Sequence, residues 1–430
     1  MMKGKYITVL LVTALLVSNT VFTSGCRKEV VKSKDVTNSD PKVLSELKDD
    51  GKEIEKEKGE VSVTKCSDNM GMKIFKEEAA AKRSKNVIIS PISLFTALDI
   101  LTNGADGETK KQMKDVMGIN SYTDDSLNSE MKKLINGYKA DDNNRRPGFI
   151  NIYNSLWLDK KFQVKDSFIE KSKGFYNSEI YKQDMSDKNA ITNMNKWISE
   201  KTGGLIKNPI SQLQKNTVMT VFNVLHFKGK WTNPFDKSKT QVDNFKLSSG
   251  ESVKVKMMNG QRFLNYYEDG KVQAGVFEYY NGKMIVLLPK GDIDNFIASL
   301  STADVQKYEK KAEMYITKVK LPVFNVEYKD DLNGVLMKMG MTLPFDAAKA
   351  NFNNLQNSKN PLWIDKVIHD CVVSVDEEGT EAAALTAEML CGSSKPPEEV
   401  KEFYVNKPFV FMIQDNINNS ILFVGKVEKP

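Results

Sequence analysis

The stretch from Val375 to Ala387, VDEEGTEAAALTA, most constrains what this chain can fold into, because it suits two conformational states. It follows a run rich in β-branched residues, Trp363 to Val375, and a polar stretch with two serines and two prolines separates it from the next strand-like run. Residues two apart share one face of a strand, and here they are small. They are Thr380, Ala382, Ala384 and Thr386. The stretch therefore suits either a solvent loop or helix start, or entry into a crowded sheet as a new strand.

Further motifs stand at separated places in the chain. They are NVIISPIS from Asn86 with the LFTAL and GA that follow it, FNVLHFKGKW from Phe222, FYVNKPFVF from Phe403, and ILFVGKV from Ile421. Their order and spacing resemble those of the serpins, a family of protease inhibitors whose exposed loop inserts into their own sheet. The resemblance extends from about Asp68 to Pro430. It implies the serpin fold, with an exposed reactive-centre loop and a buried second helix after Asn86.

The pattern of elements independently favours one large domain. Gly/Ser-rich and Pro-rich linkers are absent after residue 65, and helical and strand-like runs alternate irregularly, which indicates an α+β class with mostly antiparallel sheets. The predicted helices cover 70–82, 109–117, 189–201 and 330–339, and the predicted strands cover 150–158, 217–227, 283–288 and 315–326. We therefore predict a single domain over 66–430.

The first 25 residues form a predicted signal peptide. Lys3 and Lys5 precede an apolar run that is short for a bilayer span, so cleavage is favoured over an uncleaved anchor. The run ends in TSGC, which resembles the lipobox of bacterial lipoproteins, with Thr23 where Leu is usual. Cys26 would then carry lipid and anchor a secreted, extracellular protein to the cell membrane. Ordinary secretion with cleavage near Gly25 is the alternative.

Residues 26–65 form a predicted charged tether. From Arg27 to Gly59 the chain is dense in Lys, Glu and Asp and poor in apolar residues, so it buries too little surface to offset its ordering entropy. Val43, Leu44 and Leu47 leave open a short amphipathic helix that docks on the body. The net charge of +6 is mild for 430 residues, so no nucleic-acid partner is expected, and we expect a monomer.

Cysteine and histidine usage excludes common site chemistries. Neither His226 nor His369 belongs to a metal-ligand spacing, so no metal and no cofactor are predicted. Hydrolase elbows and phosphate loops are also missing, although a Ser-His-Asp triad assembled from distant residues stays open. With Cys26 lipidated, an odd set of three cysteines remains, which argues against a disulfide framework. Cys371 is expected in the core, and Cys391 in the exposed loop.

The resemblance assigns roles to particular residues. A buried polar cluster beneath the strands that must part, the shutter, would comprise Ser90, Ser93, Asn223 and His369, and Trp231 would close the breach above it. For Ser90 and His369 the alternative is a plain helix start and a strand hydrogen bond. The hinge of the loop would comprise Glu377, Gly379, Thr380, Ala382, Ala383, Ala384 and Thr386.

Family spacing from Gly379 places the reactive bond between Ser393 and Ser394. The segment after Pro396 is longer than is usual in the family, and Met389, Leu390 and Cys391 are alternative positions. A small residue at the cut favours an elastase-like or subtilisin-like serine protease, Met389 or Leu390 would suit a chymotrypsin-like one, and Lys395 keeps a trypsin-like target open.

The resemblance implies an irreversible suicide-substrate inhibitor of serine proteases that is not itself an enzyme. The alternative is a non-inhibitory serpin-fold protein that acts as a binding or chaperone-like protein at the cell surface. Two departures bear on this choice. The basic residue that usually pairs with Glu377 is replaced by Val323, so we expect packing around Trp231 or another cation to hold the breach. Glu388 falls on the inward face, where an unpaired carboxylate is costly to bury.

Overall fold

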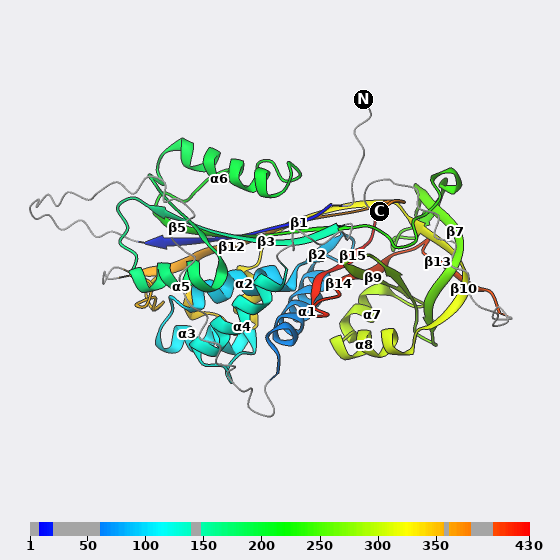
Figure 1. The fold of residues 1–430 in the computed structure, drawn as a ribbon, viewed down its shortest axis with the longest axis horizontal. Helices are drawn as coiled ribbons and strands as arrows, with labels where there is room; N and C mark the ends of the chain where they lie inside the picture. The colour runs from blue at the N-terminus through cyan, green and yellow to red at the C-terminus, as the bar shows by residue number, and fades with distance from the viewer. Residues whose placement is uncertain (1–7, 20–60, 139–147, 357–360, 380–398) are drawn as a thin grey trace, which may run out of the picture.

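The computed structural model describes residues 8–19, 61–138, 148–356, 361–379 and 399–430, drawn in colour in Figure 1. Cys26, residues 26–60 of the predicted tether, and the loop from Thr380 to Glu398 lie outside the described residues. Among the described residues, no helix is both long and apolar enough to cross a bilayer.

Helices form where polar caps precede an apolar stripe. Ser62 caps α1 by accepting a hydrogen bond from the Lys65 N–H, and Gly118 ends α3 in the left-handed conformation. The helices are α1 Val63–Ala81, α2 Pro91–Thr102, α3 Gly107–Met117, α4 Asp124–Gly137, α5 Asp166–Tyr176, α6 Lys188–Lys201, α7 Ile293–Ser299, α8 Thr302–Lys311 and α9 Asn333–Lys338, with short 3₁₀ turns η2 Lys237–Lys239 and η3 Leu343–Phe345. Every residue of α2 is buried, which agrees with the predicted buried helix after Asn86.

A six-stranded sheet forms the middle layer. Its order is β11 Phe324–Asp331, β12 Leu362–Val375, β1 Thr8–Asn19, β5 Thr217–Gly229, β3 Gly148–Asp159 and β4 Glu179–Gln183. Neighbours are antiparallel except β3 and β4, which are parallel. Because β1 is antiparallel to both of its neighbours, β5 and β12 run in the same direction.

The second sheet has nine strands and supplies the far end of the molecule. Its order is β13 Lys401–Tyr404, β10 Glu313–Pro322, β7 Ser252–Glu268, β8 Val272–Glu278, β9 Gly282–Pro289, β14 Phe409–Asp415, β15 Ile421–Val427 and β2 Val87–Ile89, with β6 Gln241–Lys246 paired to β7. Its only parallel pair is β10 with β13. The α+β class with mostly antiparallel sheets is therefore confirmed.

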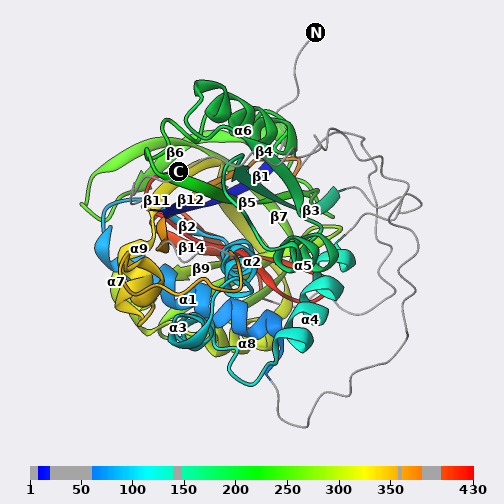
Figure 2. The ribbon, with the colours of Figure 1, turned by 90° about the vertical axis from the view of Figure 1, so that its left-hand side faces the viewer.

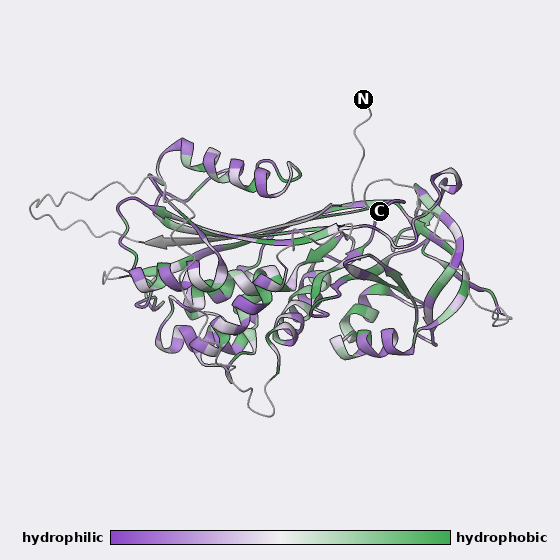
Figure 3. Cartoon of the chain, in the orientation of Figure 1, coloured by the Kyte–Doolittle hydropathy of each residue, from purple (hydrophilic) through white to green (hydrophobic). Residues whose placement is uncertain are grey.

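The inner strands of the six-stranded sheet pack against a core cluster on each face. In Figures 1 and 2, α6 lies on one face and the remaining helices near this sheet lie on the other. Along β5, Phe222 and Val224 pack in a cluster under α6, while Val221 and Leu225 point into the main core. This alternation follows the period of two of a strand. The apolar segments of Figure 3 accordingly run along the strands and the inner faces of the helices.

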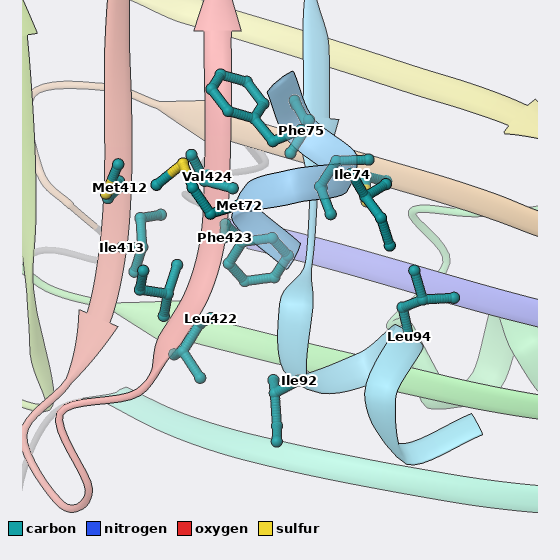
Figure 4. Packing of buried hydrophobic residues seen from close by; sticks show 14 of the residues in the cluster. Met72, Ile74, Phe75, Ile92, Leu94, Met412, Ile413, Leu422, Phe423 and Val424 are labelled. Atoms are coloured by element: carbon teal, nitrogen blue, oxygen red, sulfur yellow. The ribbon is translucent and has the colours of Figure 1, made fainter. Parts of the chain in front are cut away.

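The main core joins the two sheets through α1 and α2. Figure 4 shows α1 side chains such as Phe75 against Phe423 of β15, with Ile92 of α2 nearby. These side chains are fully buried. The core therefore anchors β15 and α2 and gives the six-stranded sheet a fixed floor.

Four predictions differ from the structure. The predicted strand 315–326 is two strands, β10 and β11, interrupted at Val323, whose N–H donates to the Lys256 carbonyl at 2.8 Å. The predicted helix 330–339 begins only at Asn333, because Asp330 and Asp331 end β11. The apolar part of the predicted signal peptide forms β1, a strand that the sequence did not indicate. Helix α1 begins at Val63, ahead of the predicted domain start at residue 66.

Candidate functional site

The centre of the candidate site is the position between β5 and β12 in the six-stranded sheet, called the central position below. In the full chain β1 fills it, and Figure 1 shows this strand in dark blue between its neighbours. The outer edge of β5 is taken by β3 and that of β12 by β11. The central position therefore holds one strand, and the strand that fills it, β1, runs antiparallel to β5 and β12.

A buried polar cluster lies at the middle of the central position. Asn223 of β5 and His369 of β12 both pair in register with Thr13, so the two side chains flank the same point. From below, Ser93 of α2 donates a hydrogen bond to the Asn223 side-chain oxygen, and the Ser90 N–H donates to His369 Nε2 at 3.2 Å. The structure thus brings together the four predicted shutter residues, all of them fully buried.

The cluster extends beyond the predicted residues. The Asn223 side-chain amide donates to Asn154 Oδ1 of β3 at 2.7 Å, and the Asn154 amide donates to the Tyr176 carbonyl at 2.7 Å. This chain ties three parts of the fold together: α2, the strands β5 and β3, and the end of α5. Because each polar group is buried, losing one partner leaves another unsatisfied, at a cost of roughly 1–3 kcal/mol.

The histidine of this cluster is not arranged for catalysis. Burial lowers the pKa of His369 to about 3, and its Nε2 accepts the Ser90 N–H, so the ring is neutral. Cys371 Sγ lies 3.1 Å from the same nitrogen, but burial raises the pKa of this thiol well above its usual value. A neutral thiol is a poor nucleophile. Within the described part of the chain, no group of side chains is placed to hold a metal ion either.

Above the polar cluster, Trp231 closes the end of the central position. Its indole N–H donates to the Asp376 carbonyl at 2.9 Å, and its ring stacks on Tyr279 with centroids 4.1 Å apart. Trp231 is 3% exposed, so this indole hydrogen bond is shielded from water. The predicted breach tryptophan therefore contacts the first residue after β12.

The residues that follow β12 are held by contacts from the 231–240 segment. The Phe235 N–H donates to the Glu377 carbonyl at 2.8 Å, and Thr240 Oγ1 donates to Glu377 Oε1 at 2.6 Å. The adjacent Glu378 forms an ion pair with Lys237. The nearby cation, Lys237, thus pairs with Glu378, whereas the Glu377 side chain accepts a hydrogen bond from a hydroxyl.

Gly379 is the last described residue before the loop and approaches the backbone closely. Its φ is +68°, a left-handed conformation that favours glycine. A Cβ there would lie 2.2 Å from the backbone nitrogen of Trp231. The predicted hinge glycine is therefore required for both reasons. The other hinge residues, Thr380, Ala382, Ala383, Ala384 and Thr386, and the reactive-bond residues Met389, Leu390, Cys391, Ser393 and Ser394 lie outside the described residues.

Asp376 carries a perturbed carboxyl at the start of the hinge. Partial burial raises its pKa from about 3.8 to about 6, and the neighbouring carboxylates of Glu377 and Glu378 act in the same direction. A backbone hydrogen bond from Glu378, at 3.0 Å, opposes the shift. At neutral pH the hinge thus contains an ionised carboxylate in an unfavourable environment.

Comparison with known proteins identifies this arrangement. A family model described as "Serpin (serine protease inhibitor)" matches residues 65–430. The chain is a serpin. An uncharacterized serpin-like protein of Thermococcus kodakarensis is 31% identical over 433 residues, covering 98% of this chain and 99% of the relative. Serpin-Z7 of Hordeum vulgare is 31% identical over 360 residues, covering 80% of this chain and 90% of the relative.

Solved serpin structures share the fold. Human thyroxine-binding globulin superimposes with a TM-score of 0.77 at 25% identity, covering 86% of this chain and 98% of that protein. Tengpin, a thermophilic serpin, gives 0.74 at 26% identity, covering 85% of this serpin and 94% of Tengpin. The family is described as one of serine protease inhibitors, so the comparisons show the serpin family and the serpin fold for this chain.

We predict that Gly379→Ala lowers the thermal unfolding midpoint more than Gly250→Ala does. Both glycines have positive φ, but an added Cβ at Gly250 meets no atom within 4 Å. The difference between the variants therefore isolates the contact with Trp231. We expect a further loss of about 2–4 °C, measured by calorimetry at one scan rate. Equal losses would show that the hinge is not pressed against Trp231.

We predict that Asp376→Asn raises the unfolding midpoint at pH 7.5. A carboxyl whose pKa is higher in the folded state stabilises below its unfolded pKa of about 3.8 and loses that effect as pH rises through about 6. The gain should be on the order of 1 kcal/mol and shrink as pH falls below 6. Asp243→Asn is the control with the opposite sign at neutral pH, because Lys320 lowers the Asp243 pKa. A pH-independent gain at Asp376 would contradict this account.

We predict that Asn223→Ala lowers the free energy of unfolding by about 1–3 kcal/mol, since Ser93 and Asn154 each lose a buried partner. Thr220→Val is the matched control on the same strand. Its hydroxyl is buried and finds no hydrogen-bond partner among the described residues, so its replacement should cost little. Urea titration of both variants makes the comparison. A similar loss in both would assign the effect to packing alone.

Proposed function

We propose that this serpin is an irreversible suicide-substrate inhibitor of serine proteases that acts by inserting its cleaved loop at the central position. The serine Oγ of the protease attacks the Ser393 carbonyl carbon, the Ser393–Ser394 peptide bond breaks, and Ser394 leaves with a new amino group. The Ser393 acyl group remains on the protease as an ester. Insertion of the loop then carries the protease away before water reaches the ester.

The observation that best supports insertion is the direction of the central position. The strand observed there, β1, runs antiparallel to β12. A chain that leaves β12 at Val375 and turns back through Asp376–Gly379 acquires this direction at once. The loop therefore needs only a hairpin turn to enter.

A register follows from that turn. With Asp376–Gly379 as the turn, Thr380 faces Val375, and each later residue faces the preceding residue of β12. Thr386 then faces His369, at the point where Thr13 of β1 pairs with the same histidine. The inserted threonine would lie at the buried polar cluster.

The same register sorts the loop side chains by face. Directly opposed residues of antiparallel strands point to the same side of the sheet. Val375, Val373 and Cys371 belong to the main core, so the residues opposite them, Thr380, Ala382 and Ala384, would point there. The floor formed by α2 is densely packed, and small side chains suit it. Ala383 would face Val372, in the cluster under α6.

The free energy of the new hydrogen bonds favours insertion once the loop is cut. About a dozen residues that gain sheet hydrogen bonds, at roughly 0.5–1.5 kcal/mol each, supply on the order of 10 kcal/mol. That is comparable to the whole stability of a typical domain. The uncut serpin would then persist because the barrier is high, not because its fold is the most stable one.

A non-inhibitory binding or chaperone-like role at the cell surface is the second candidate. Human thyroxine-binding globulin, solved as a complex with thyroxine, shares this fold, so the fold alone does not establish inhibition. The hinge composition favours inhibition, since charged or bulky residues at Thr380, Ala382 or Ala384 would obstruct entry.

We further propose a location and a class of target. Removal of residues 1–25 would release a secreted protein that carries lipid at Cys26, with residues 26–65 as the tether to the cell membrane. The domain from 66 to 430 would act there as a monomer. Ser393 at the cut favours an elastase-like or subtilisin-like protease, and a chymotrypsin-like enzyme would cut at Met389 or Leu390.

We predict that the processed protein forms a covalent complex with one of these proteases and that Thr380→Arg abolishes it. An arginine at Thr380 would have to enter the core opposite Val375, which is fully buried. The loop of the variant should still be cut, since the reactive bond lies far along the loop. Denaturing electrophoresis and intact mass resolve the complex and the C-terminal peptide that starts at Ser394.

Glu398→Arg is the matched control, because it adds the same side chain beyond the reactive bond. This control should retain the complex. Unchanged complex formation by Thr380→Arg would refute insertion at this register. Cleavage of the parent protein without any complex, and with no rise in thermal stability after the cut, would favour the binding role.

A further inference from the structure

The strand at the central position comes from the first residues of the chain. β1 pairs with β12 from Leu10 opposite Val372 to Asn19 opposite Leu362. It pairs with β5 from Thr8 opposite Lys228 to Ser18 opposite Thr217. Both ladders extend over nearly the whole strand. In the full chain, residues 8–19 of the predicted signal peptide, called the leader below, thus pair with the edges of β5 and β12 that face each other.

We propose that Thr8–Asn19 is a built-in blocking strand, which keeps the unprocessed serpin non-inhibitory until the leader is removed. The loss of protease inhibition rests on the proposed loop insertion. The presence of β1 at the central position does not. Since the central position accepts one strand, the loop can enter only after β1 has left.

The composition of β1 suits this position. The segment TVLLVTALLVSN contains no charged residue and is rich in Val, Leu and Thr. A strand whose neighbours are buried on both faces is expected to be almost continuously apolar. The loop that would compete for the position contains Glu381 and Glu388. Placing the leader at the central position therefore costs less desolvation free energy than placing the loop there.

The chain is long enough to make this connection. Between Asn19 and Val63 lie residues 20–62, and an extended chain of that length spans up to about 3.3–3.6 Å per residue. This reach exceeds the dimensions of a domain of this size. The leader can therefore occupy the sheet while α1 keeps its place in the core.

The presence of β1 at the central position also explains how the chain that retains its leader avoids unpaired strand edges in the sheet. Without a central strand, β5 and β12 would have to pair directly with each other as parallel strands, and any part of their edges left unpaired would be open to strands from other molecules. A leader strand supplied by the same chain fills the position before an external strand does. Processing would then expose the position only in the compartment where the inhibitor acts.

The test compares full-length chains made without export, so that the leader stays attached, as intact mass verifies. One is the parent, one carries Leu11→Pro and Leu15→Pro within β1, and the control carries Val21→Pro and Ser24→Pro beyond it. Proline removes ladder hydrogen bonds from a central strand. The first readout is amide hydrogen exchange of β5 and β12, which needs no protease. The second readout is the amount of covalent complex formed with an elastase-like or subtilisin-like protease.

We expect the β1 prolines to lower the exchange protection of β5 and β12 at least about tenfold, and the control to leave it unchanged. The same variant should form at least about tenfold more covalent complex than the parent. Equal protection in all three chains would overturn the blocking strand. Lost protection with equal complex formation by parent and variant would overturn its inhibitory consequence. Lost protection without complex from the variant or from the processed protein would confirm occupancy and refute the proposed function instead.

Discussion

The two strand edges that face each other across the central position impose the constraint on which the rest of this serpin depends. β5 and β12 run in the same direction, each contributes side chains to both core clusters, and each already has a partner on its other side. Their facing backbone groups have little access to water, so the position must either hold a strand or close by direct pairing of β5 with β12. In the proposed mechanism, the surrounding structure controls which strand enters and when.

The middle of the central position and the hinge at its end are held by interactions of different strength. The polar cluster around Asn223 and His369 is fully buried, so its hydrogen bonds resist separation of the strands. The hinge is held more weakly. Its ion pair joins Glu378 to a lysine whose side chain is 63% exposed, and such pairs contribute about 0–1 kcal/mol. Asp376 adds an unfavourable charge at neutral pH. The chain that must move is therefore held loosely, while the sheet that must part is held firmly.

Local sequence signals predicted much of this arrangement, and long-range contacts account for what they missed. Ser90, Ser93, Asn223 and His369 each lie in a recognisable motif, and the structure brings them together. Asn154 and Thr240 join the site through hydrogen bonds to residues 69 and 137 positions away, and nothing in their local pattern indicates this. The break between β10 and β11 did have a signal, since Pro322 within a strand-like run favours an interruption. Strand β1 was missed because an uncharged Val/Leu run suits both a signal peptide and a doubly buried strand.

The competition between leader and loop finally depends on one carboxylate. In the proposed register Glu388 faces Val367, a fully buried residue of β12, and Leu15 of β1 pairs in register with the same residue. A carboxylate that enters this place must be protonated or find a partner, whereas no such demand falls on the leader. Full insertion of the loop is therefore less favourable near Glu388 than at Thr380 to Thr386. In the proposed mechanism, the early part of insertion would supply the driving force, and the last part would limit it. The loop would then enter the central position only after the apolar strand β1 has been removed.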